Sequence, residues 1–148
     1  MKSIATYLLL ALIFISCTKD DESSEELSNE PSISFVSLDP LEVQNFNNSV
    51  TLTIKYKDNN GDLGFEDPDV FSLYVKDARL DTADYYHVPP LAPLGKNLIA
   101  EGQLDIVLNS MFILGNGDQE FAALSVKIKD RAGNWSNLVN TPAITINR

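Results

Sequence analysis

The sequence predicts an all-β domain, an antiparallel β-sandwich, over residues 32–148. In six segments of this region polar and apolar residues alternate with a period of two, which is typical of strands with one buried face. Clusters of Asn, Asp, Gly and Pro, which favour turns, separate the segments. No stretch of useful length has the period of a helix. The length of the region suits one domain with a single core.

The first three strands are expected at residues 32–38, 49–57 and 70–76, where alternate residues are apolar. Asp-Pro and Asn-Asn pairs lie between the first two strands, and an Asn-Gly pair follows the second. In chain order, the residues expected to face the core are Ile33 and Phe35, then Val50, Leu52, Ile54 and Tyr56, then Phe71, Leu73 and Val75.

The last three strands are expected at residues 103–109, 121–129 and 142–147, and a short edge strand near residues 85–88 would be a seventh. A Gly-Asn-Gly-Asp run and an Ala-Gly-Asn run supply the turns between them. In chain order, the residues expected to face the core are Leu104, Ile106 and Leu108, then Leu124, Val126 and Ile128, then Ile144 and Ile146.

This number and spacing of short strands resembles a single immunoglobulin-like or fibronectin-III-like sandwich. The resemblance is to the broad class, which includes bacterial surface Ig-like domains, because two antibody features are missing. The only cysteine, Cys17, precedes the domain, so no disulfide can join the sheets. Trp135 follows the strand at 121–129 instead of lying on the third strand.

Two similar stretches, KYKDNNGDLG at 55–64 and KIKDRAGNWS at 127–136, end the second and fifth expected strands. In this class of sandwich the loops that follow these strands emerge at the same end. One interpretation is turn chemistry, because Asp, Asn and Gly end strands and bond to their own loop amides. The other is a calcium site that gathers oxygen ligands from both loops. Its expected ligands are Asp58, Asn60, Asp62, Asp130 and Asn134.

The long connection at residues 77–97 is a second candidate surface. Tyr85, Tyr86 and His87 are adjacent there, and we expect them to form a platform on which a glycan or a protein ligand could stack. The alternative is that the three prolines of this connection block an exposed edge strand against aggregation.

The first residues, MKSIATYLLLALIFISC, have a basic start, a short apolar run and a small-residue boundary, as export signals do. FISC resembles the lipobox of bacterial lipoproteins, although Phe14 stands where that motif prefers leucine. TKDDESSEE after it is similar to the surface-export signal of Bacteroidetes-type lipoproteins. The resemblance implies a signal peptide at 1–16, acylated Cys17 and an outer-membrane protein that faces the exterior. The alternative is an ordinary secretory peptide with a coincidental cysteine.

Residues 17–31 carry six acidic side chains and almost nothing apolar, so we expect a flexible tether between lipid and domain. The net charge of −10 makes nucleic acid a poor partner and favours cations or basic partners. The chain has one histidine and no recognisable nucleophile, zinc or phosphate motif, so we do not expect an enzyme. We expect a surface binding or accessory module, or alternatively a purely structural component of the envelope. The sequence does not indicate the oligomeric state.

Overall fold

The computed structural model describes residues 28–148, which contain ten strands and no helix. Cys17, the leader and most of the expected tether lie outside these residues. Among residues 28–148 no helix is long and apolar enough to cross a membrane. In chain order the strands are β1 (Ser32–Asp39), β2 (Glu42–Gln44), β3 (Val50–Asp58), β4 (Leu73–Asp77), β5 (Asp84–Tyr86), β6 (Ala100–Leu108), β7 (Gln119–Ala122), β8 (Leu124–Ile128), β9 (Val139–Asn140) and β10 (Ile144–Asn147).

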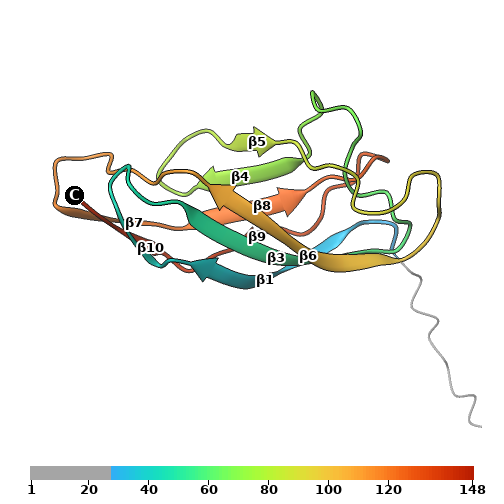
Figure 1. Ribbon diagram of the computed structural model, residues 1–148, viewed down its shortest axis with the longest axis horizontal. Helices are drawn as coiled ribbons and strands as arrows, with labels where there is room; N and C mark the ends of the chain where they lie inside the picture. The colour runs from blue at the N-terminus through green and yellow to red at the C-terminus, as the bar shows by residue number, and fades with distance from the viewer. Residues whose placement is uncertain (1–27) are drawn as a thin grey trace, which may run out of the picture.

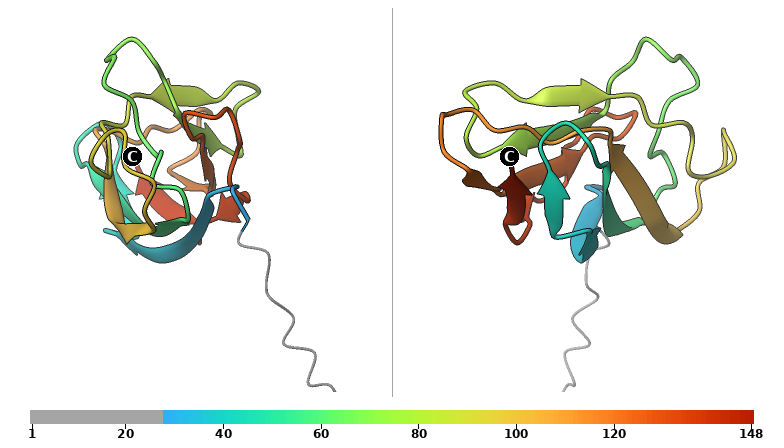
Figure 2. Two further views of the ribbon diagram at one scale, coloured as in Figure 1. Left: turned by 90° about the vertical axis from the view of Figure 1, so that its right-hand side faces the viewer. Right: turned by 60° about the vertical axis from the view of Figure 1, so that its left-hand side comes forward.

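The strands form two facing layers (Figures 1 and 2). One layer is the sheet β1-β3-β6, and the other contains the sheet β5-β4-β8-β9. A third sheet, β2-β10-β7, continues the second layer, because β7 leads into β8 and β9 leads into β10. All pairings are antiparallel except that of β2 with β10.

This strand order confirms the predicted Ig-like sandwich. The chain places its first, second and fourth long strands, β1, β3 and β6, in one sheet. It places β4 and β8 together in the other sheet, as strands C and F are in immunoglobulin domains. Constant-type domains have a fourth strand, D, beside strand E in the first sheet. Here β6 takes the place of strand E, and none of the strands in the described part of the chain lies on its outer side.

The core lies between the two layers and matches most of the expected inward residues. Within residues 28–148 this cluster runs from Ile33 to Ile146, so this part of the chain has a hydrophobic core of its own. The fully buried side chains at its centre come from both layers: they include Leu52, Ile54, Val126, Ile128, Ile144 and Ile146.

Two phenylalanines that we expected in the core are partly exposed. Phe35 is 37% exposed because it lies on edge strand β1 beside a bulge, after which Leu38 takes the inward position. Phe71 is 53% exposed because β4 begins only at Leu73, so residue 71 belongs to the preceding loop.

The predicted boundaries differ most where a strand changes partners. β6 begins at Ala100, three residues before the expected start. The expected strand at 121–129 is divided into β7 and β8, which belong to different sheets. The expected strand at 142–147 corresponds to β10, and the two-residue strand β9 before it was not expected. β2 was not expected, because its three residues are ordered by pairing with β10 and carry no alternation long enough to recognise.

Candidate functional site

The two repeated stretches meet at one end of the sandwich, at the right of Figure 1, where β3 and β8 both end. Asp58 and Asp130 are the residues that follow the shared Lys-x-Lys pattern, and each has no exposed surface. A β-bridge between Leu63 and Asp130 joins the two loops. The expectation that these loops emerge together is therefore confirmed.

Both buried carboxylates accept hydrogen bonds from their own loops. Asp58 Oδ2 accepts from the amides of Asp62 and Leu63, at 2.7 and 3.0 Å. Asp130 Oδ1 accepts from the Asn134 amide at 2.7 Å, and its Oδ2 accepts from Asn134 Nδ2 at 2.9 Å. The repetition thus has a structural explanation: each aspartate satisfies the amides of a tight loop that would otherwise lack partners.

Arg131 is a residue of this end that sequence reasoning missed. Its guanidinium donates to the carbonyls of Gly64 and Gly61 in the opposite loop, at 2.7 and 3.1 Å. Burial raises the pKa of Asp62, and the carboxylates of Asp130 and Asp58 raise it further, whereas Arg131 lowers it. Arg131 therefore links the two loops and partly balances their negative charge.

These bonds engage the carboxylate oxygens of Asp58 and Asp130, which are among the oxygens that we expected to bind calcium. Asn60 Nδ2, when its amide is oriented toward the carboxylates, donates to Asp62 Oδ1 at 3.0 Å and also to Asp58. Within residues 28–148 no group of three or more His, Cys, Asp or Glu side chains has the spacing to hold a metal ion. Turn chemistry accounts for the geometry without an ion, and calcium binding stays a prediction for experiment.

Tyr85, Tyr86 and His87 do not form one platform. Adjacent residues of β5 point to opposite faces, so the two tyrosines are separated. Tyr85 packs edge to face on Tyr74 with ring centroids 5.6 Å apart. Tyr86 points inward, and His87 Nδ1 lies 3.1 Å from the carbonyl oxygen of Val70.

The outer face of β4 and β8 carries a row of stacked rings and lysines. Lys127 Nζ lies 5.1 Å from the ring centre of Tyr74 and 4.4 Å from that of Trp135. Lys129 Nζ lies 5.5 Å from the Trp135 ring centre. The lysines cover the faces of the Tyr74 and Trp135 rings. These contacts between neighbouring side chains hold the loop after β8 in place.

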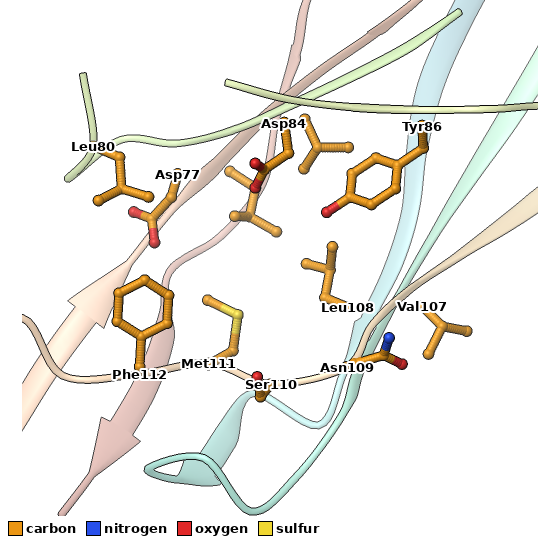
Figure 3. Close-up of a pocket in the computed structure, with 12 residues that line it drawn as sticks. Asp77, Leu80, Asp84, Tyr86, Val107, Leu108, Asn109, Ser110, Met111 and Phe112 are labelled. Carbon is orange, nitrogen blue, oxygen red and sulfur yellow. The ribbon is translucent and has the colours of Figure 1, made fainter. Parts of the chain in front are cut away.

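A more open surface lies at an edge of the sandwich, between β5 and the end of β6 (Figure 3). It is a cavity of about 240 Å³. The apolar residues that line it are Val75, Leu80, Val107, Leu108, Met111, Phe112 and Leu124. Asp84 and Tyr86 point into it from β5 (Figure 3).

The two carboxylates of this cavity differ in their partners. Asp77 is held by Arg79, whose Nη2 lies 2.6 Å from Asp77 Oδ2 and whose Nη1 lies 2.7 Å from Glu120. Asp84 makes no ion pair or side-chain hydrogen bond within the described residues. Burial raises the pKa of Tyr86, and the nearby Asp84 carboxylate raises it further. Asp84 is thus the carboxylate that is available to a ligand.

A second cavity of about 220 Å³ continues the first along β6. It is lined by Leu73, His87, Val88, Pro89, Leu104, Asp105 and Ile106, and it shares Tyr86 and Val107 with the first. We call the two cavities together the edge groove, because they lie between edge strands β5 and β6. The sequence contained one signal for it, the tyrosines near residue 85, but did not show which of them faces inward.

Comparisons with known proteins add little to this description. No protein-family model matches the chain, and no curated protein matches it. A solved structure with a similar fold is the PKD domain of an M14-like peptidase from Thermoplasmatales archaeon SCGC AB-540-F20, with 13% identity and a TM-score of 0.42. The match covers 81% of this chain and 95% of that one. The fold assignment above rests on strand order.

Proposed function

We propose that this protein is a lipid-anchored module of the outer cell surface that binds a ligand in the edge groove. The edge groove carries the proposal. It combines an apolar lining with the Asp84 carboxylate and the Tyr86 hydroxyl, and such a mixture of apolar surface and a few polar groups is typical of ligand sites.

The contacts in and near the groove favour binding over catalysis. The Asp77 carboxylate is neutralised by Arg79, and His87 is directed at a backbone carbonyl of the neighbouring loop. A carboxylate pair for acid and base catalysis needs two groups with separate protonation states facing one substrate. Of the two carboxylates in the first cavity, Asp77 and Asp84, only Asp84 makes no ion pair within the described residues.

The proposed location at the cell surface rests on the likeness of residues 14–26 to a lipobox and a surface-export signal. Residues 17–31 separate the proposed acylated cysteine from β1, and fifteen residues can span at most about 50 Å. The tether is therefore long enough to hold the sandwich clear of the lipid headgroups. A multiply acylated cysteine would give the stable anchoring that a single chain does not.

Two variants test the address in cells. Cys17→Ser is expected to release the protein from the membrane fraction, because the acylated residue is lost. Replacing Lys19, Asp20, Asp21 and Glu22 by alanine is expected to keep it anchored but move it inside, where external protease cannot reach it. If intact cells lose the alanine variant to protease as fast as the wild type, the surface-export proposal fails.

The groove is tested separately on the purified domain. Leu108→Ala and Asp84→Asn change its lining and its charge, and Asp69→Asn, an exposed change at a residue that does not line the groove, is the control. Ligand retention from surface extract that falls in both groove variants and persists in the control supports the proposal. Retention that is equal in all three places the binding surface elsewhere.

A further inference from the structure

β6 is a long edge strand, and within residues 28–148 no strand pairs with its outer side. The connection between β5 and β6 could have supplied the fourth strand of this sheet, but it is held elsewhere. The Phe65 amide donates to the Val88 carbonyl at 2.8 Å, and the Leu91 amide donates to the Leu63 carbonyl at 3.1 Å. Pro89 lies directly over Gly64, where a Cβ would collide with the Pro89 carbonyl. The connection therefore pairs with the loop after β3 and not with β6.

The hydrogen bonds of the opposite edge show which backbone groups of β6 are unpaired. Both the N–H and the C=O of Ile33 bond to the Asn137 side chain at 2.9 Å, so they point away from β3. In an antiparallel ladder, two directly opposite residues either bond to each other or both point their backbone groups away from each other. Tyr56 is opposite Ile33, so its backbone groups point toward β6, where they bond to Gly102. By alternation, the residues whose backbone groups point outward from the free edge are Glu101, Gln103, Asp105 and Val107.

The two edges of this sheet are protected very differently. β1 has a bulge after Phe35 and the Asn137 side chain on its outer groups, and both features discourage pairing with another chain. β6 has nine residues in unbroken register with β3 and contains no proline and no lysine. An edge of this kind is a template for one more strand.

The charges along this edge indicate the occupant. Glu101 and Asp105 are exposed on the outer face of β6, and Asp84 faces it from the other side of the edge groove. A second copy of this chain would bring its own acidic residues to the same edge, and the net charge of −10 opposes that contact. A basic segment would instead be attracted.

We propose that the free edge of β6 binds an extended segment of a partner protein in which apolar and basic residues alternate. The segment adds as the fourth strand of the sheet β1-β3-β6. Its backbone bonds to the four outward positions, its apolar side chains enter the edge groove, and its basic side chains lie beside Glu101 and Asp105. This inference rests on the proposed binding function and names the class of ligand.

The test follows amide hydrogen exchange of residues 28–148 by NMR, with defined peptides as probes. The first probe is a capped nine-residue peptide of alternating valine and lysine. The second has glutamate in place of lysine, and the third is the first peptide with proline at its centre. In the free protein the amides of Gln103 and Asp105 should exchange fast, and those of Leu104 and Ile106, which bond to β3, should exchange slowly.

The valine-lysine peptide is expected to slow exchange at the outward amides at least tenfold and to leave the already slow ones unchanged. The glutamate and proline peptides should have no such effect. Gln103→Pro removes one outward N–H without touching the β3 ladder, and should weaken binding at least tenfold, whereas Gln103→Val should retain it. If Gln103→Pro does not fold, Asp105→Lys replaces it, since it keeps the N–H and repels the lysines.

Three results would overturn the inference. They are no slowing with the valine-lysine peptide, equal slowing with the glutamate peptide, and slowing without peptide that grows with protein concentration, which would indicate a second copy at the edge. These results leave the surface address untouched, because protease access in intact cells measures that independently. Conversely, if the protein stays inside the cell but binds the peptide at β6, the proposed surface location is wrong and this inference holds.

Discussion

Asp58→Asn is the substitution that best separates turn chemistry from calcium binding at the repeated stretches. In the structure the Asp58 carboxylate is fully buried and accepts two short bonds, from the amides of Asp62 and Leu63. Asparagine keeps the shape but removes the charge and turns one oxygen into a donor. If the aspartate serves the turn, the domain should become less stable in the absence of calcium.

The magnitude follows from these contacts. A hydrogen bond to a charged group contributes about 1.5–3 kcal/mol and a neutral one about 0.5–1.5 kcal/mol, so two bonds lose about 2 kcal/mol together. Relief of repulsion with the partly exposed Asp62 returns less than about 1 kcal/mol. The net loss of about 1.5 kcal/mol corresponds to a melting midpoint lower by roughly 5 °C for a domain of this size.

The assay is thermal unfolding of residues 28–148, followed by circular dichroism in chelator and in millimolar calcium. Asp130→Asn should behave like Asp58→Asn, because its carboxylate serves the second loop in the same way. Asp69→Asn is the control, since it removes an exposed charge from the same end of the sandwich.

Calcium binding predicts the opposite pattern. The wild type would then melt later in calcium than in chelator, by about 2.7 kcal/mol of stabilisation at a hundredfold excess over Kd. Magnesium would act much more weakly, and both asparagine variants would lose the shift. If Asp58→Asn is as stable as the wild type or more stable in chelator, repulsion outweighs the amide bonds and the turn explanation is refuted.

Three further predictions concern the core, the charged cluster near β7 and the pH dependence. Val126→Asp should cost about 4 kcal/mol or more in the free energy of unfolding, because it buries an unpaired charge, whereas Ser125→Asp on the outer face should cost under about 1 kcal/mol; equal losses in urea unfolding would contradict the two-layer fold. Arg79→Lys should lower the melting midpoint, because lysine cannot make the forked contact with one carboxylate while reaching Glu120, and an unchanged midpoint would show that this cluster is not stabilising. Because the pKa of Asp62 is raised in the fold, its ionised form destabilises the domain. The free energy of unfolding should therefore increase as pH falls through the raised pKa toward the ordinary one. Asp62→Asn should remove this pH dependence, and a variant whose stability changes with pH as steeply as that of the wild type would show that other groups cause it.

Much of the fold was predictable because strand alternation is a local property. Leu52 and Val126 face the core and their sequence neighbours do not, as the period of two requires. Phe35 and Phe71 were exceptions, because a bulge and a late strand start changed the phase at those points. A bulge depends on how one strand fits its partner, and the strand's own residues do not reveal it.

The candidate site was less predictable, since most of it joins distant segments. The sequence identified Asp58 and Asp130 as equivalent, but the bonds that hold their carboxylates are visible only in the folded loops. Arg131 has no motif of its own, and its role depends on the carbonyls of a loop far from it in the chain. Tyr86 looked equivalent to Tyr85 until the pairing of β5 with β4 placed them on opposite faces.

The sequence by itself determined the strands, their inward faces, the acidic charge and the likeness of residues 14–26 to an export and lipidation signal, because each of these is written in neighbouring residues. Only the tertiary structure decided that β6 is a free edge and that the edge groove lies beside it. The physical reason is that segments compete for strand pairing. The connection after β5 bonds to the loop after β3, and the outward groups of β6 have no strand partner within residues 28–148.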